Sequence, residues 1–289
     1  MKGLVTFLLT VMLSACTGTY AAKNLPTQTT GKMTSATLSS TKTGADYPLS
    51  IYLPASYALG AKTYAVIYAT DGDAGFPPAG RFLNFAEILQ RRNIDAILVG
   101  IGGTSRRNTD YRLPGARAYH AFLIDELVPF IESHFRADPA QRILSGVSFG
   151  GSFVVSSLFM EAAKSPVFSC YISTEGSFFQ PSFVVQEKAF VSDVGNKSIP
   201  ATLILARGAP NRTRQQVSSV PGTKDTLAFS NLARNLSSEA TNHTEVDVFY
   251  HRMIDRNYPG LTIVETTFDT DHIGTDNPAF DDAMKRIFK

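Results

Sequence analysis

The stretch ILSGVSFGG, residues 143–151, places three glycines around Ser148 and lies between two apolar runs. Two interpretations compete: a flexible turn that contains a serine, or a strained turn between a strand and a helix that holds the serine towards a substrate. A Gly-x-Ser-x-Gly pattern alone arises by chance in about one chain in ten of this length, given the usual frequencies of both residues. Here it directly follows a strand-like run and directly precedes a helical run, and this context favours the strained turn.

The glycines around the serine have a steric explanation. The serine backbone is strained at such a turn, and a side chain at any of the glycines would collide with the neighbouring strand or helix. A serine hydroxyl is a weak nucleophile, so it needs a nearby base and hydrogen-bond donors for the oxyanion that it creates. We expect one donor at the amide of Phe149 and a second in the loop of Gly72 and Asp73, which follows an early strand.

Strand-like and helix-like segments alternate from residue 36 to the end of the chain. Short, continuously apolar strands separated by helices predict a mostly parallel sheet with helices on both faces, which is one α/β domain. The expected strands span residues 36–40, 48–54, 63–70, 94–101, 142–147, 167–174, 201–208 and 261–269, and the expected helices span 81–92, 116–135, 151–163, 225–240 and 277–288.

The N-terminus has the layout of an export signal. Residues 1–15 contain one Lys, an apolar run too short to span a bilayer, and small residues at the end. The sequence Leu-Ser-Ala-Cys ending at Cys16 resembles the bacterial lipobox, which predicts a lipid anchor on Cys16; the alternative is an ordinary secretory signal. Residues 16–35 are rich in Thr, Ala and Gly and are expected to form a tether, with the folded domain at 36–289. We therefore expect a periplasmic lipoprotein held at the outer membrane.

Composition narrows the classes of partner. The formal net charge of the whole chain is +2, and the Arg91-Arg92 and Arg106-Arg107 pairs are isolated, so no nucleic-acid partner is expected. The chain has two cysteines. With Cys16 acylated, no disulfide is expected, and Cys170 in its apolar strand is interpreted as a small buried hydrophobe.

One of the five histidines is placed to act as a base. His272 lies in TTFDTDHIGTDNP, residues 266–278, a polar loop between the last strand and the last helix. In hydrolases with this type of sheet the base follows the serine and the acid in the chain. The alternative is a solvated loop histidine. His120 and His134 fall in a predicted helix, His243 in a polar turn and His251 beside a strand end, so these four are interpreted as surface or packing residues.

Several separated segments resemble one family. The chain is similar to α/β hydrolases of the enterochelin-esterase and esterase D type, which implies the α/β-hydrolase fold. The resemblance implies that Ser148 is the nucleophile and His272 the base, and that the loop of Gly72 and Asp73 completes the oxyanion site with Phe149. It is carried by YPLSIYLPASY (47–57), TYAVIYATDGDAGF (63–76), VGIGGTSRRNTDYRLPG (99–115), IDELVPFIESHFR (124–136) and RNYPGLTIVETTFDTDHIG (256–274).

The acid of the family is missing from its usual place. After the strand at 201–206 the family often has Gly followed three residues later by an acid, and here that residue is Asn211. Glu175, just past the preceding strand, is the favoured substitute, although it could be a solvated loop carboxylate. Asp225 is the other acid candidate, but it is also a good helix N-cap. A Ser-His dyad with no acid is the third alternative.

Other polar residues near these motifs have simpler explanations. Arg107 and Asp110 lie in a loop that the family places beside its active site, and we interpret them as partners of each other rather than as substrate ligands. Asp269, Asp271 and His272 lack a recognised ligand spacing such as HExxH, so no metal site is expected, and no cofactor.

Together these features predict a serine esterase that acts on a small-molecule ester through an acyl-enzyme, with siderophore esters as one candidate. Two alternatives stay open: an acyltransferase, and a non-catalytic surface lipoprotein with a hydrolase fold that binds a ligand or partner. The missing acid motivates the last one.

Overall fold

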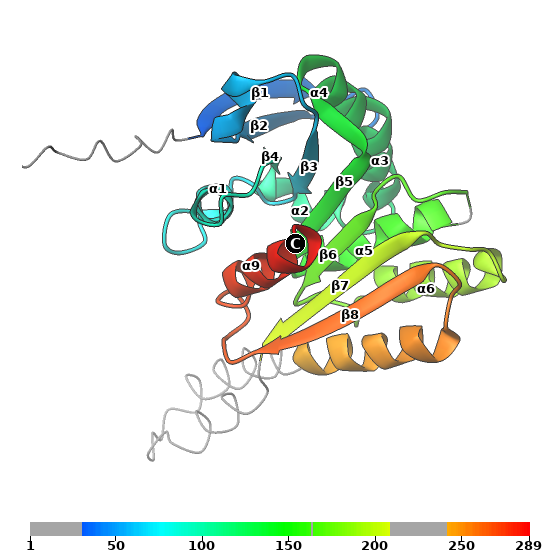
Figure 1. Ribbon diagram of the computed structural model, residues 1–289. Helices are drawn as coiled ribbons and strands as arrows, with labels where there is room; N and C mark the ends of the chain where they lie inside the picture. Colours follow the sequence, from blue (N-terminus) through cyan, green and yellow to red (C-terminus); the bar gives the residue numbers. More distant parts are fainter. Residues whose placement is uncertain (1–30, 163, 209–241) are drawn as a thin grey trace, which may run out of the picture.

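A single twisted sheet of eight strands forms the centre of the protein, as a computed structural model shows (Figure 1). The structure describes residues 31–162, 164–208 and 242–289. The strand order is β1-β2-β4-β3-β5-β6-β7-β8. The strands are β1 (Lys32–Ser39), β2 (Asp46–Leu53), β3 (Tyr64–Ala69), β4 (Ala96–Ile101), β5 (Ala137–Val147), β6 (Cys170–Thr174), β7 (Ala201–Gly208) and β8 (Leu261–Phe268).

The sheet is antiparallel at one end and parallel elsewhere. β1 pairs antiparallel with β2, and β2 antiparallel with β4. All pairs from β4 to β8 are parallel. The carboxyl ends of β3 to β8 therefore lie at one edge, where ligands bind in open α/β sheets. The mostly parallel sheet expected from the sequence is confirmed.

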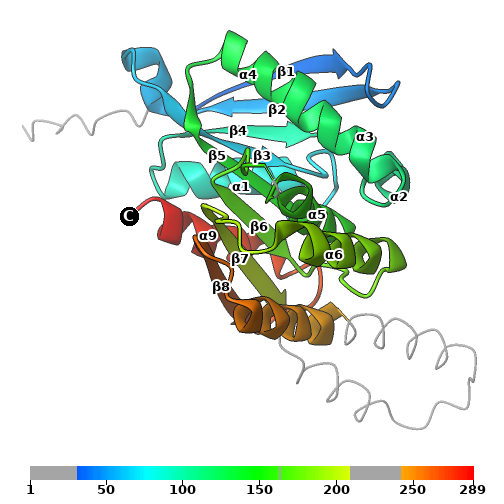
Figure 2. The ribbon, with the colours of Figure 1, turned by 90° about the vertical axis from the view of Figure 1, so that its right-hand side faces the viewer.

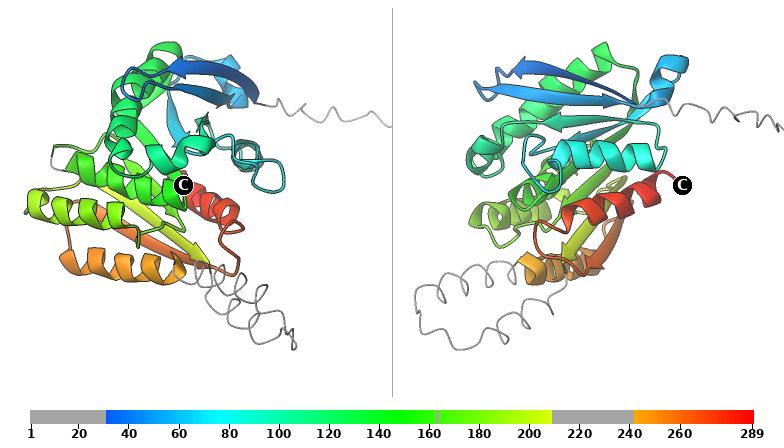
Figure 3. Two further views of the ribbon diagram at one scale, coloured as in Figure 1. Left: turned by 180° about the vertical axis from the view of Figure 1, so that it is seen from behind. Right: turned by 90° about the vertical axis from the view of Figure 1, so that its left-hand side faces the viewer.

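Helices cover both faces of the sheet. The larger layer, which faces the viewer in Figure 2, contains α3, α4, α5, α6 and a helix over residues 242–256. α1 and α9 lie side by side on the other face, as the right-hand view in Figure 3 shows. The bounds are α1 (Arg81–Arg91), α2 (Arg107–Asp110), α3 (Gly115–Phe122), α4 (Val128–His134), α5 (Phe149–Ala162), α6 (Pro181–Val194) and α9 (Asp276–Ile287), with short turns η1 (Ala55–Leu59) and η2 (Thr104–Arg106) and a π-helical turn η3 (Leu123–Leu127).

Strand β3 shows how the two layers are packed. Val66 and Tyr68 belong to the core under the larger layer, whereas Ala65, Ile67 and Ala69 belong to the core under α1 and α9. Successive side chains of a strand point to opposite faces, so an uninterrupted apolar run serves a sheet that is buried on both sides. Every residue of β3 and β4 is buried.

Three features differ from the sequence-based expectation. Strand β1 begins at Lys32, inside the expected tether, because it pairs with β2 over its whole length. Helix α6 was not predicted, although its buried Phe183, Glu187, Phe190 and Val194 have helical spacing. The helix over 242–256 was not predicted either, while the predicted helix at 225–240 lies outside the described residues. Within the described ranges, none of the helices is both long and apolar enough to cross a bilayer.

Candidate active site

Three neighbouring strands lead into residues with a left-handed backbone. Asp71 follows β3, Ser148 follows β5 and Glu175 follows β6, with φ angles of 53°, 58° and 51°. Non-glycine residues adopt this conformation rarely, and such strain is concentrated at functional sites. Because β3, β5 and β6 are adjacent, the three residues lie at one edge of the sheet. This edge is the candidate active site.

The turn at Ser148 requires its glycines. A Cβ atom at Gly146 would lie 2.3 Å from the carbonyl oxygen of Gly150, and one at Gly151 would lie 2.8 Å from that of Thr174. Both distances are far below a normal contact, so the steric explanation from the sequence is confirmed. The amide of Ser148 donates to the Thr174 carbonyl at 2.9 Å, which fixes the turn against the end of β6.

Glu175 and His272 come together at this edge. Val147 pairs with Thr174 in the sheet, so Ser148 and Glu175 leave neighbouring strands side by side. Oε2 of Glu175 lies 3.0 Å from Nδ1 of His272. The Glu175 side chain is fully buried and that of His272 is 17% exposed. With Nδ1 turned to the carboxylate, the other ring nitrogen of His272 is free to exchange a proton with a nucleophile or leaving group.

A second histidine contacts the same carboxylate. Nδ1 of His243 lies 2.7 Å from Oε1 of Glu175, and the Gly208 amide donates to the same oxygen. His243 was interpreted as a surface or packing residue in a polar turn; instead it lies in the first turn of the helix over 242–256 and is 1% exposed. The buried Val246, Phe249 and Met253 follow it at helical spacing, which is the signal that could have placed it inward.

These contacts set the charge of Glu175. Burial alone would raise the pKa of its carboxyl group. Hydrogen bonds from His243 and His272, the charge interaction with His243 and the Gly208 amide together outweigh burial and leave the pKa below its ordinary value. Glu175 is therefore a carboxylate around neutral pH, as an acid that orients a catalytic histidine must be.

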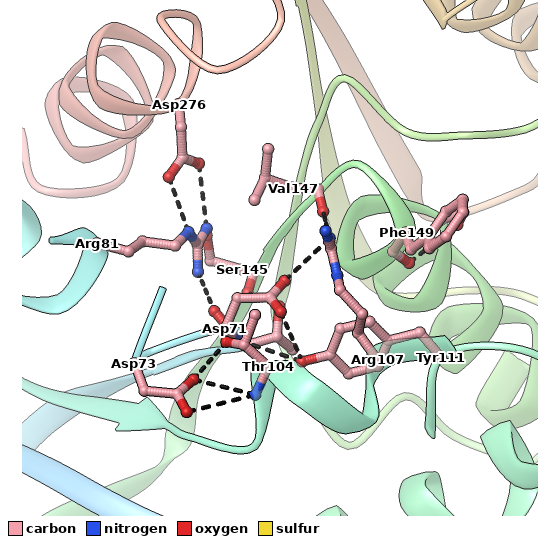
Figure 4. Close-up of polar contacts among 12 residues, drawn as sticks. Asp71, Asp73, Arg81, Thr104, Arg107, Tyr111, Ser145, Val147, Phe149 and Asp276 are labelled. Atoms are coloured by element: carbon pink, nitrogen blue, oxygen red, sulfur yellow. Dashed lines mark hydrogen bonds and ion pairs between the residues drawn. The ribbon is translucent and has the colours of Figure 1, made fainter. Parts of the chain in front are cut away.

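The expected oxyanion donors differ in whether their amides are available to a ligand. Phe149 is the first residue of α5, so its amide has no acceptor within the helix and is available to a ligand. The amide of Gly72 donates to the Ile101 carbonyl at 2.8 Å, so it is not available to an oxyanion. Of the two residues expected in this loop, only Asp73 stays a candidate donor. The Asp73 carboxylate accepts hydrogen bonds from Gly103 and Thr104, which attaches this loop to the end of β4 (Figure 4).

Arg107 contacts the backbone directly before the turn at Ser148. Its Nη2 atom lies 3.3 Å from Oδ2 of Asp71 and 3.3 Å from the carbonyl oxygen of Val147, the residue before Ser148 (Figure 4). Burial raises the pKa of Asp71, although the charges of Arg107 and Arg81 oppose the change. The interpretation that Arg107 pairs with Asp110 is wrong. Asp110 accepts hydrogen bonds from Arg106 at 3.1 Å and from Tyr47 at 2.9 Å.

A buried ion pair connects the His272 loop to the sheet. Asp276, the first residue of α9, lies 2.8 Å from Nε of Arg81, the first residue of α1 (Figure 4). The two side chains are 2% and 0% exposed. Arg81 also donates to the Thr70 carbonyl at the end of β3 and to Oγ of Ser145 in β5. The loop that carries His272 is thus anchored at the same edge as Ser148.

The remaining candidate residues make other contacts or lie outside the described residues. Oδ1 of Asp271 accepts a hydrogen bond from the Gly274 amide, and no group of three or more His, Cys, Asp or Glu residues in the described ranges could hold a metal ion. Cys170 is buried in β6, as expected, and burial raises its pKa to about 12. His134 and His251 are exposed, while His120 is buried against Glu161. Outside the described residues lie Cys16, Asn211 and Asp225.

Known proteins resemble this chain in sequence and in structure. Ferri-bacillibactin esterase BesA of Bacillus subtilis is 27% identical over 177 residues, which cover 50% of this chain and 59% of that protein, so the match spans less than two thirds of the relative's length. Siderophore hydrolase EstA of Aspergillus nidulans superposes with a TM-score of 0.70 at 20% identity, covering 88% of this chain and 93% of that one. An IroE-like serine hydrolase of Shewanella oneidensis gives a TM-score of 0.68 at 22% identity, with 89% and 80% covered.

The structural likenesses establish an α/β-hydrolase fold, with its mostly parallel sheet and its helices on both faces. A family model described as "Putative esterase" matches residues 40–260, which is most of the chain. The protein therefore belongs to the family described as "Putative esterase".

Proposed function

We propose that the protein is a serine esterase that hydrolyses carboxylic esters through an acyl-enzyme. The contact between Glu175 and His272, at the end of the strand next to that of Ser148, is the observation that carries this proposal. It supports Glu175 as the acid that the sequence left open, and it thereby weakens the main reason to prefer a binding protein without catalysis. The strained backbone at Ser148 supports the same conclusion, because a ligand-binding protein has no need to maintain it.

Each group then has a defined task. Oγ of Ser148 attacks the ester carbonyl while Nε2 of His272 takes its proton, and the alcohol leaves after His272 returns that proton to it. The Phe149 amide, with the Asp73 amide, donates hydrogen bonds to the oxyanion of the tetrahedral intermediate. Water activated by His272 then attacks the acyl-enzyme and releases the acid. Glu175 keeps His272 in the tautomer with its proton on Nδ1.

For the substrate we propose siderophore esters, within the wider class of small-molecule esters. The names of the Bacillus and Aspergillus relatives support this choice. The charge beside the nucleophile supports it as well. The guanidinium group of Arg112 lies 5.5 Å from the ring centroid of Phe149, the residue after Ser148, so its positive charge favours ligands with anionic groups. Arg107 lies at the same distance from this ring, but it is paired with Asp71. Turnover of ferri-bacillibactin, compared with a short p-nitrophenyl ester, tests the choice; turnover of the neutral ester alone would exclude it.

Covalent labelling tests the catalytic proposal. We expect a fluorophosphonate probe to modify the wild-type protein once, because a serine activated by a histidine attacks phosphorus as it attacks an ester carbonyl. Intact-mass measurement should locate the label on Ser148. Ser148→Ala should abolish both labelling and ester hydrolysis, whereas Ser133→Ala, which changes an exposed serine, should retain both. Folded wild-type protein that takes up no label would refute the proposal.

We also propose that Cys16 carries a lipid anchor that holds the enzyme at the periplasmic face of the outer membrane. An acyl chain contributes about 0.8 kcal/mol of membrane affinity per buried CH₂ group. Cys16→Ser should therefore move the protein from the membrane fraction to the soluble fraction of cells that process lipoproteins. Equal fractionation of Cys16→Ser and wild type would exclude the anchor. The substitution should leave the fluorophosphonate labelling of the protein unchanged.

A further inference from the structure

The carboxylate of Glu175 has its two oxygens divided between two sets of donors. Oε1 accepts hydrogen bonds from the Gly208 amide and from Nδ1 of His243, and Oε2 faces Nδ1 of His272 at 3.0 Å. The first set comes from the end of β7 and from the helix over 242–256, and His272 comes from the loop after β8. A carboxylate with one oxygen held by two donors cannot rotate about its terminal bond without breaking both contacts. The other oxygen is thereby fixed towards His272.

His243 is itself held rigidly in place. It lies one to three helical turns before Val246, Phe249 and Met253, each of which is fully buried in the core. A Cβ atom at Gly208 would lie 2.6 Å from Cε1 of His243, so only glycine allows the backbone to approach the ring this closely. The ring is therefore buried and packed closely against the backbone at the end of β7.

The two histidines on Glu175 differ in the surroundings of Nε2. In His243 this atom is buried and has no hydrogen-bond partner in the described part of the chain. A proton there would be both desolvated and unpaired, whereas a proton on Nδ1 faces Oε1 of Glu175. His243 therefore acts as a hydrogen-bond donor to the carboxylate through Nδ1. It cannot replace His272 as the base, because its Nε2 has no route to a substrate.

We propose that His243 is a positioning residue for the reaction: it holds Oε1 of Glu175 so that Oε2 stays directed at His272. This inference rests on the proposed esterase activity. It makes two claims that a purely structural role would not make. The loss of His243 should affect kcat and spare KM, because the ring acts on the acid and does not touch the substrate. It should also change the pH dependence of the reaction.

The pH effect follows from the groups that contact Glu175, which are His243, His272 on its loop and the Gly208 amide. Asn242, beside His243, contacts Nδ1 of His272 at 3.2 Å and not Glu175. Burial raises the pKa of Glu175, and the His243 hydrogen bond is one of the contacts that lower it. Without that donor the pKa of Glu175 rises. Because the reaction requires Glu175 to be ionised, the low-pH limb of kcat/KM should move to higher pH.

Two polar substitutions distinguish the loss of the hydrogen-bond donor at the Nδ1 position from the loss of the imidazole ring. The amide nitrogen of His243→Asn lies near the former Nδ1 position, whereas that of His243→Gln lies nearer the former Nε2 position. We expect His243→Gln to lose about 10²-fold in kcat with KM unchanged, the size expected when a catalytic group is misplaced by about 1 Å. Its low-pH limb should move upwards. His243→Asn should recover most of the rate and the wild-type limb.

His120→Gln is a matched control, because His120 is another buried histidine paired with a glutamate, Glu161, at 2.7 Å. It should leave kcat and the pH profile unchanged. A wild-type profile for His243→Gln, or equal losses in His243→Gln and His243→Asn, would overturn the positioning role. Wild-type protein that neither labels with fluorophosphonate nor hydrolyses esters would instead overturn the proposed function, so the two failures are distinguishable.

Discussion

Glu175→Gln is expected to lower kcat by about 10⁴-fold, the loss seen when the acid of a serine triad is replaced by its amide. The surroundings of Glu175 decide which way the new amide points. The Gly208 amide and Nδ1 of His243 both require an acceptor at the Oε1 position, so the amide oxygen lies there and the NH₂ group faces His272. Nδ1 of His272 must then accept a hydrogen bond, which places its proton on Nε2. In that tautomer His272 cannot take the proton of Ser148.

The substitution keeps size and shape, so stability should change little compared with activity. Stopped-flow or single-turnover hydrolysis of an activated ester, together with the rate of fluorophosphonate labelling, measures the loss. Glu161→Gln is the matched control, because Glu161 is also a buried glutamate that contacts a histidine, His120. Its kcat should equal that of the wild type. A near-normal rate in Glu175→Gln would remove Glu175 from the mechanism and leave Asp225, or a dyad of Ser148 and His272, as the alternative.

Local sequence patterns predicted the centre of the fold because each pattern belongs to one short segment. The apolar runs at 63–70, 94–101 and 142–147 correspond to strands β3, β4 and β5, and the glycines around Ser148 have the predicted close contacts. Helices α6 and 242–256 were missed although their buried residues have helical spacing. No helix was predicted at either place, although tertiary packing buries one face of each helix.

The relation between Glu175 and its partners was beyond local patterns. Glu175 and His272 are 97 residues apart, and Glu175 and His243 are 68 apart. The sequence could place each of them only at the end of a strand or in a turn, which is why a solvated Glu175, Asp225 and a dyad all stayed open. The register of β5 with β6 and of β7 with β8 brings the groups together, and register is a property of the assembled sheet. Asn211 shows that the usual acid of the family is absent from that position, but it does not indicate which other residue takes its role.

Arg81→Met is expected to lower the free energy of unfolding by about 3–5 kcal/mol, the cost of breaking a buried ion pair and leaving one charge without its partner. The guanidinium group is fully buried and holds Asp276, the Thr70 carbonyl and Oγ of Ser145. It also lies over the ring of Phe85, 4.5 Å from the centroid. Met fills much of the same volume but donates no hydrogen bond, so the carboxylate of Asp276 stays buried and unpaired.

The effect should extend to catalysis, because Asp276 begins the helix that follows the His272 loop. Urea unfolding measures the stability, and kcat measured well below the unfolding midpoint shows whether the loop is loosened. The exposed pair of Lys62 and Asp95 provides the control: Lys62→Met should change stability far less than Arg81→Met, because exposed ion pairs contribute little. In Arg81→Met combined with Asp276→Leu, part of the lost stability should return, since no buried charge is left unpaired. A loss for Arg81→Met no larger than that for Lys62→Met would show that the buried pair does not hold α9 against the sheet.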